Sequence, residues 1–369
     1  MALELIVLST FFRMLIMKSL FTPSSMIVSE KGSSRRDVLG RGLGIFAFSA
    51  LSGTGVVRAQ SGTPVMISEA IKLGMYISAY TAKRKGLFTK HGLDATIVPA
   101  GGIALPVPIL LSGRGQFSIT GPGMAVNSTN EGGKMKVIAK IVGGVAMWAV
   151  GRPGSKITSL DQFKNKTLAT LRFPSSTIQT PTFTMREHGG FDPKENGVKF
   201  LELPPGAQAQ AVKDGRADYA PMFEWDVSIA TRQLGLEVAY SFADAIGSLA
   251  WTTSFVTEEY LSKNSQVVQA YCNAIAEAQK LLHSDPSVFV EVSLAEFPQV
   301  DKAAIESAAT NFLRTRFVVP RNPTISKSDW DAVMKLELGG GAIKQPLSYE
   351  QMVDNSFALK ASNQFGLSS

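Results

Sequence analysis

Cysteine and histidine are both scarce in this sequence, and their scarcity limits the chemistry that the chain can perform. The 369 residues include one cysteine, Cys272, and three histidines, His91, His188 and His283. A single cysteine excludes an intramolecular disulfide and any metal site built from several thiolates. The histidines do not stand at metal-ligand spacing, and each lies near an expected helix end, where a cationic side chain is favoured. We therefore expect no metal site, and because no Ser/His/Asp order stands out either, we expect no cofactor and no catalytic residue.

Charged residues are also few, at 18% of the chain, against about a quarter in typical proteins. Residues 1–59 hold seven of the 37 basic residues and three of the 30 acidic ones, so the formal net charge of +7 falls to +3 for the rest of the chain. No basic run there is interleaved with aromatic residues. This pattern predicts no nucleic-acid partner.

Long apolar runs are missing after residue 59, so no membrane-spanning segment is predicted there. Earlier in the chain, Arg35 and Arg36 precede a modestly apolar stretch over 42–57, and small residues lead to Ala59. This order is typical of an export signal. The paired arginines resemble the twin-arginine type, although two later positions depart from that motif, so the Sec route stays open. We predict cleavage after Ala59 and a periplasmic protein.

From residue 60 onward, short apolar runs alternate with segments of helical periodicity, which indicates an α/β fold with parallel strands. A first series of strands is expected at 65–69, 94–98, 116–120, 136–142 and 145–150. A second is expected at 167–171, 199–203, 218–223 and 237–242, followed by an extended segment at 249–256 and a mainly helical tail that ends with a helix over 349–359.

Two such series predict two α/β lobes that face each other across a cleft. The expected division is an export signal over 1–59, the first part of lobe 1 over 60–148 and lobe 2 over 149–248. A return crossing and a helical tail over 249–369 would complete lobe 1.

The turn Gly121-Pro122-Gly123, between an expected strand and a helix from Met124, is a candidate binding feature. Ligands of open α/β sheets lie beyond the carboxyl ends of the strands. The turn leaves backbone N–H groups at a helix N-terminus, where they can bond a polar ligand group. The glycines could equally serve only to make a tight turn.

Several motifs occur in order along the chain and resemble those of one protein family. They are KGLFTKHGLD over 85–94, LSGRGQF over 111–117 with Gln116 where an acid is usual, Gly121-Pro122, SLDQFKNKTLA over 159–169, and QAVKDGRADYA over 210–220. Together they resemble the substrate-binding proteins of the nitrate/sulfonate/taurine and thiamine-precursor ABC importers.

This resemblance implies a periplasmic-binding-protein type II fold, with two lobes and a hinge that closes around a small-molecule solute. It implies a monomer, not an enzyme, that passes the solute to an ABC permease and ATPase at the inner membrane. A pyrimidine-biosynthesis enzyme of the same fold would need a cysteine-rich motif that this chain lacks. A periplasmic sensor with this fold stays open.

The residues expected in the cleft lie at strand ends, and we predict Glu69, Lys72, Gly101, Gly102, Gly121, Pro122, Met124, Trp148, Ser175, Ser176, Thr177, Glu224 and Trp225. Two acids, one lysine and several apolar side chains favour a neutral or amine-bearing, pyrimidine-like solute over an anion. Glu224 would accept from its amine, and aromatic side chains would stack on its ring. A sulfonate held by backbone N–H groups stays open. Ser175 or Ser176 could be only a helix cap, and Trp148 and Trp251 could be core residues.

Overall fold

The computed structural model describes residues 62–173, 175–314 and 318–367. The predicted export signal, with Arg35, Arg36 and Ala59, lies outside these residues. In the described ranges, no helix is both long enough and apolar enough to cross a membrane.

The strands in the described ranges form three sheets, in the orders β2-β1-β3, β10-β4 and β7-β6-β8-β5-β9. Their bounds are β1 (Thr63–Glu69), β2 (Leu93–Pro99), β3 (Phe117–Ile119), β4 (Met135–Val142), β5 (Met147–Gly151), β6 (Thr167–Leu171), β7 (Lys199–Leu203), β8 (Tyr219–Phe223), β9 (Glu237–Ser241) and β10 (Thr252–Thr257). We call the first two sheets with their helices the first lobe, and the five-stranded sheet with its helices the second lobe.

The first sheet is parallel, as predicted, with β1 between β2 and β3. The prediction of one parallel series was wrong for its last two strands, because β4 pairs antiparallel with β10, and β5 pairs antiparallel with β8 and β9. All five residues of β5 are buried. A strand buried on both faces carries an uninterrupted apolar run, so its hydrophobic pattern does not reveal its direction.

The helical segments are η1 (Gly74–Tyr76), α2 (Ile77–Arg84), α3 (Leu87–Lys90), α4 (Pro106–Leu111), α5 (Gly123–Asn130), η2 (Leu160–Phe163), α6 (Ser176–Glu187), α7 (Gln208–Lys213), α8 (Asp226–Leu234), α9 (Phe242–Ile246), α10 (Glu258–Lys263), α11 (Ser265–Ser284), α12 (Ser287–Glu296), α13 (Lys302–Arg314), α14 (Lys327–Gly339), α15 (Tyr349–Met352) and α16 (Ser356–Gln364). The single helix expected over 349–359 is two helices. Val353 lies between them in extended conformation and bridges to Val137 of β4, which interrupts the helix.

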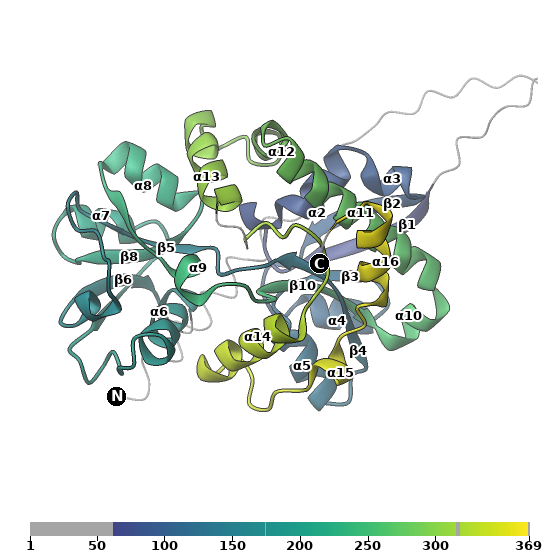
Figure 1. Ribbon diagram of the computed structural model, residues 1–369, viewed down its shortest axis with the longest axis horizontal. Helices are drawn as coiled ribbons and strands as arrows, with labels where there is room; N and C mark the ends of the chain where they lie inside the picture. The colour runs from purple at the N-terminus through teal and green to yellow at the C-terminus, as the bar shows by residue number, and fades with distance from the viewer. Residues whose placement is uncertain (1–61, 174, 315–317, 368–369) are drawn as a thin grey trace, which may run out of the picture. The chain divides into compact units, whose positions relative to one another are not determined.

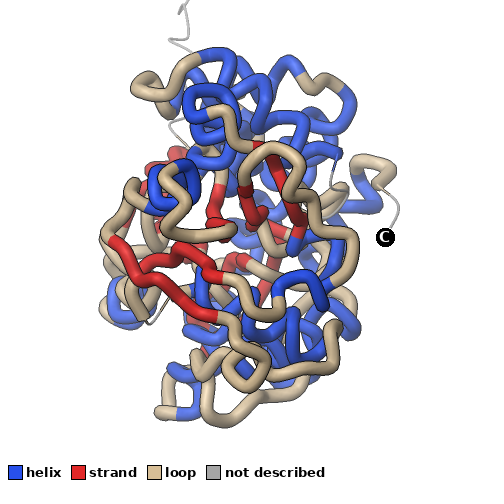
Figure 2. Tube along the Cα trace, turned by 90° about the vertical axis from the view of Figure 1, so that its left-hand side faces the viewer, coloured by secondary structure: helices blue, strands red, loops and turns tan. Residues whose placement is uncertain are grey.

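Helices cover the sheets of both lobes (Figure 1), and the strands run between helical layers when the molecule is turned by 90° (Figure 2). The tail packs on the first lobe through α11 and α16. It also reaches the second lobe, because α13 packs on α8 and α14 packs on α6. The tail therefore touches both lobes, which the sequence did not indicate.

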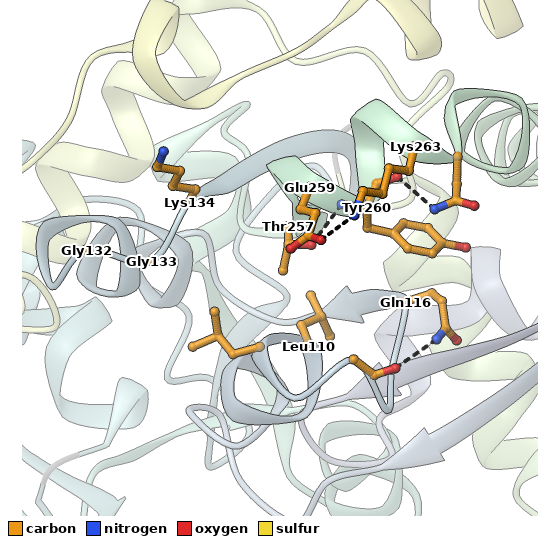
Figure 3. Close-up of a pocket in the computed structure, with 13 residues that line it drawn as sticks. Leu110, Gln116, Gly132, Gly133, Lys134, Thr257, Glu259, Tyr260 and Lys263 are labelled. Carbon is orange, nitrogen blue, oxygen red and sulfur yellow. Dashed lines mark hydrogen bonds and ion pairs between the residues drawn. The ribbon is translucent and has the colours of Figure 1, made fainter.

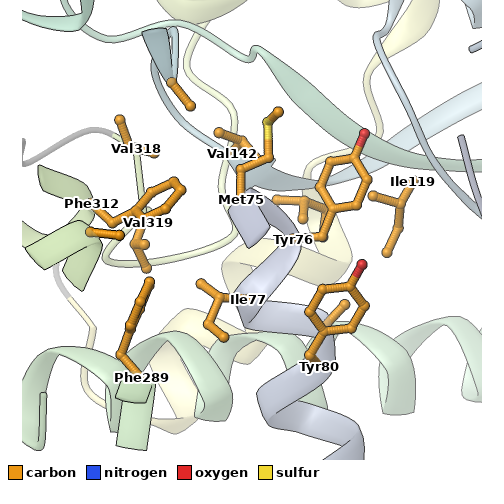
Figure 4. Packing of buried hydrophobic residues seen from close by; sticks show 14 of the residues in the cluster. Met75, Tyr76, Ile77, Tyr80, Ile119, Val142, Phe289, Phe312, Val318 and Val319 are labelled. Carbon is orange, nitrogen blue, oxygen red and sulfur yellow. The ribbon is translucent and has the colours of Figure 1, made fainter. Parts of the chain in front are cut away.

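The core of the first lobe gathers around the helical turn that follows β1. Ile77 and Tyr80 of α2 are both buried. Figure 4 shows Ile77 beside Phe289 of α12, with Tyr76 and Tyr80 on the other side of the turn. Cys272 is also fully buried, in α11, and burial raises the pKa of its thiol. It behaves as a small core residue, as expected.

Candidate functional site

A cavity of about 210 Å³ lies between the two lobes and the tail. It is lined by Ile71, Leu73, Met75, Tyr76, Ile103, Thr120, Gly121, Met124, Ser176, Gln179, Phe223, Trp251, Thr252, Leu336, Glu337, Gly340 and Ala342. Thr120 follows β3, Phe223 ends β8, and Ser176 begins the helix after β6. Carboxyl ends of parallel strands from both lobes therefore meet at the cavity, which is where α/β folds bind ligands.

Three of the predicted site residues line this cavity. Gly121 and Met124 come from the turn after β3, and Ser176 comes from the start of α6. Their position agrees with the expected geometry of the cleft, and contact with a ligand stays a prediction.

Glu69 and Lys72 have partners within the protein instead of lining the cavity. Glu69 is buried at the end of β1 and accepts a hydrogen bond of 2.6 Å from the Tyr80 hydroxyl. Burial raises the pKa of Glu69 to about 7. Lys72 forms an ion pair of 2.8 Å with Glu296 of α12.

Trp148, Glu224 and Trp225 belong to the packed interior around α8, α12 and α13. The carboxylate of Glu224 accepts from the backbone N–H and hydroxyl of Ser228, both at 3.0 Å, and from Asn311 at 2.5 Å. Burial raises its pKa. A carboxylate at a buried strand end needs such partners. The sequence predicted that the Glu224 carboxylate has a hydrogen-bond partner. In the structure its partners belong to α8 and α13, not to a ligand.

The other predicted residues do not line the cavity, and the structure places them in turns and helix caps next to residues that do. The N–H groups of Gly101 and Gly102 both donate to the Ala70 carbonyl. Pro122 is the cap residue of α5. Ser175 caps α6 by accepting from the Thr177 backbone, while the Thr177 hydroxyl accepts from Leu171 N–H. Ser175 is thus a helix cap, one of the two alternatives the sequence left open.

The sequence missed several lining residues, among them Tyr76, Gln179, Trp251 and Glu337. Trp251 precedes β10, in the extended segment expected to cross between the lobes. Its position in the sequence could therefore have indicated that it lines the cleft. Glu337 gave none, because it comes from a tail helix, some 210 residues away along the chain from the turn that it contacts.

The Glu337 carboxylate occupies the helix start that had been expected to bind a ligand. Its Oε1 accepts from Gly123 N–H at 3.3 Å, at the first turn of α5. Burial raises the pKa of Glu337 to about 7. A group of this protein, not only a ligand, therefore uses the backbone donor of the Gly121-Pro122-Gly123 turn.

A methyl group at position 123 should displace this carboxylate. A Cβ there would overlap Glu337 Oε2 and lie 2.8 Å from Ile343 Cγ2, whereas a Cβ at Gly121 would lie 3.1 Å from Glu337 Oε1. We expect Gly123→Ala to lower the free energy of unfolding by about 1–3 kcal/mol through overpacking, and Gly121→Ala to have a smaller effect. Urea denaturation of both variants checks this, and equal stability of wild type and Gly123→Ala would contradict the close contact.

A second, larger cavity of about 450 Å³ opens beside α10. Figure 3 shows its lining, with Gln116 on one side and Thr257, Glu259 and Lys263 on the other. Lys263 forms an ion pair of 2.6 Å with Glu259. Every residue that lines this cavity comes from the first lobe. Because it does not connect the lobes, a ligand there could not hold them together, so we take the cavity between the lobes as the candidate site.

Comparison with known proteins shows which family the chain belongs to. The family model described as NMT1/THI5 like matches residues 75–288. The chain belongs to this family. The match runs from η1 to α12 and ends before α14, so Glu337 lies outside the part of this NMT1/THI5-like protein that the family model describes.

Named relatives of this NMT1/THI5-like protein include YtlA of Bacillus subtilis, whose name describes it as a binding protein. It is 22% identical over 305 residues, which cover 82% of this chain and 91% of YtlA.

Among solved structures, the aliphatic sulphonate binding protein SsuA of Escherichia coli matches with a TM-score of 0.62 and 17% identity, over 80% of this chain and 93% of SsuA. The desulfurization enzyme DszB, solved with biphenyl-2-sulfinic acid, matches with a TM-score of 0.58 and 12% identity, over 82% of this chain and 99% of DszB. These likenesses show the type II fold of periplasmic binding proteins, with two lobes and a cleft.

Proposed function

We propose that this protein is the solute-binding component of an ABC importer. It captures a small organic solute in the cavity between the lobes and delivers it to a permease with its ATPase at the inner membrane. The observation that carries the proposal is that both lobes and the tail line one cavity. A solute there contacts all three at once, so its binding can favour one arrangement of the lobes, as hinge closure requires. The relatives named as binding proteins support the same conclusion.

The predicted export signal favours a periplasmic location, and the protein would act there as a monomer. Apolar side chains dominate the cavity, with Tyr76, Phe223 and Trp251 as its aromatic members. Such a lining suits a flat, partly aromatic body. Two ligand classes follow from the sequence and the relatives: an amine-bearing, pyrimidine-like ring, or a sulfonate such as SsuA binds.

A thermal-shift screen of the purified protein tests the proposal. The panel holds pyrimidines, flavins, aromatic amines, sulfonates, nitrate and taurine. A ligand that binds only the folded state stabilises it by about 2.7 kcal/mol at 100 times its Kd, which raises Tm by several degrees. A shift with one class supports the proposal, and no shift with any class contradicts it.

Trp251 provides an independent readout of where the solute binds. Of the four tryptophans, Trp251 lines the cavity, whereas Trp148, Trp225 and Trp330 are buried elsewhere. We expect the solute found in the screen to change the tryptophan fluorescence, and Trp251→Phe to abolish that change. Trp330→Phe is the matched control and should retain it. A change that persists in Trp251→Phe would place the solute outside this cavity.

Catalysis is the second candidate, because DszB shares the fold. The described lining residues include no cysteine and no histidine, and Glu337 is their one carboxylate. Mass spectrometry of the solute after incubation with the protein separates the two candidates. Recovery of unchanged solute supports binding, and a converted product would favour an enzyme.

A further inference from the structure

Glu337 is the one charged side chain among the described residues that line the cavity. No lysine, arginine or histidine in the described ranges forms an ion pair with it. The N–H of Gly123, a backbone group, donates a hydrogen bond to its Oε1. The other oxygen, Oε2, occupies the space that a side chain at position 123 would fill, and it fits there because residue 123 is glycine. The carboxylate thus has capacity for further donors, since it can accept about four hydrogen bonds.

An apolar cavity with a single acid is unsuited to anions. A sulfonate placed there would meet Glu337 at short range, in surroundings that screen charge poorly. It would also find Gly123 N–H already bonded to the carboxylate. A cationic N–H donor instead gains a charge-assisted hydrogen bond and neutralises the carboxylate.

We infer that Glu337 makes this cavity selective for solutes that carry a protonated amine or amidine on a flat apolar body, and that it excludes sulfonates. The inference rests on the proposed function and specifies its ligand class. The sequence had predicted that Glu224 accepts a hydrogen bond from the amine of the solute. The inference gives this role to Glu337 of the tail helix α14 instead.

The raised pKa of Glu337, a half-buried residue, links solute binding to the release of a proton. The pKa of Glu337 is raised to about 7, so protonated and ionised forms of its carboxyl coexist near neutral pH in the ligand-free protein. A cationic solute binds the ionised form and expels that proton. Affinity should therefore rise from pH 6 to pH 8 and level off above it.

Other titratable groups near α14 do not line the cavity, except for the hydroxyl of Tyr76, whose pKa is raised far above neutrality by burial. On α6, Arg186 and Glu187 are charged, and Glu187 pairs with Lys335 of α14. On α15, Glu350 is exposed. α5 carries no charged residue. A proton released near neutral pH on binding is therefore expected to come from Glu337.

Calorimetric titration with three probes of one ring tests the inference: benzylamine, benzamide and benzenesulfonate. Glu337→Gln keeps the size and removes the charge, and Asp331→Asn is the matched control, since Asp331 is an exposed acid on the same helix. We expect benzylamine to bind wild type about 10-fold or more tighter than benzamide, and benzenesulfonate not to bind. Glu337→Gln should lose this preference and Asp331→Asn should keep it. Titration in two buffers should show proton release near pH 7 by wild type and none by Glu337→Gln.

Three results would overturn the inference. If benzenesulfonate binds wild type as tightly as benzylamine, or if Glu337→Gln keeps the amine preference, Glu337 does not select the solute, although the proposed binding function stands. If no probe binds and the thermal-shift panel is also silent, both the inference and the proposed function fail.

Discussion

Replacing Trp225 by alanine is expected to lower the free energy of unfolding by about 3–5 kcal/mol, the usual cost of removing a buried large aromatic side chain. The ring comes from the turn between β8 and α8, and its side chain is 8% exposed. Its centroid lies 5.2 Å from that of Phe297 and 6.2 Å from those of Phe289 and Phe312. It also rests on Gly74, where an added Cβ would come within 2.5 Å of the ring. The side chain therefore joins the second lobe to the first lobe and the tail, and urea denaturation measures its loss.

Trp225→Phe is the matched control and should cost less than half as much. The indole Nε1 of Trp225 is buried and has no acceptor among the described residues. Phenylalanine keeps most of the aromatic contacts and removes this unsatisfied donor, which offsets part of the lost packing. If the two variants lose equal stability, packing at this position does not hold the lobes together.

Lys140→Met should be about as damaging, at roughly 3–5 kcal/mol, because it leaves a buried carboxylate without its cation. Lys140 of β4 forms an ion pair of 2.6 Å with Asp329 of α14, and the side chains are 12% and 8% exposed. Asp329 also accepts from the Ser248 hydroxyl at 2.6 Å. The pair thus fixes α14, the helix that carries Glu337, to the first lobe. Chemical denaturation at pH 7 tests this.

The pH dependence of the same variant gives a second check. Burial alone would raise the pKa of Asp329, but Lys140 and the hydroxyl donors outweigh it and lower the pKa. Because the pKa of Asp329 is lower in the folded state than in the unfolded state, its ionisation stabilises the fold at pH values above the ordinary pKa of the carboxyl. This stabilisation is lost as the pH falls through the pKa of the folded state. The stability difference between wild type and Lys140→Met should therefore shrink in acid. Lys327→Met, which breaks an exposed pair with Asp331 on α14, is the control and should cost less than about 1 kcal/mol. An equal loss in both variants would contradict this account.

Local patterns predicted most of the strands and helices, because hydrophobic periodicity and glycine stops act over a few residues. The strand at 116–120 and the turn to α5 were placed within a residue or two. What the sequence could not supply was pairing over long distance. Nothing local distinguishes β5 as a member of the second sheet, and nothing near Val353 indicates that it pairs with β4 and divides a helix.

The site shows the same limit. Gly121, Met124 and Ser176 were predicted from strand ends, and they line the cavity. Glu224 and Trp225 were also predicted there, and the structure buries them against α12 and α13, which lie far along the chain. Glu337 lies on α14, whose packing depends on tertiary contacts such as the Lys140–Asp329 pair. A tail residue of this kind becomes a site candidate only when the fold is known.

The most direct test of the account is a calorimetric titration of the purified protein with the solute that gives the largest thermal shift. We predict one saturable site per chain, with a fluorescence change lost in Trp251→Phe. We also predict an affinity that falls at least about 10-fold in Glu337→Gln, the loss of one charge-assisted hydrogen bond. Absence of saturable heat with every solute class, or binding that neither variant alters, would contradict the claim that this cavity captures the solute.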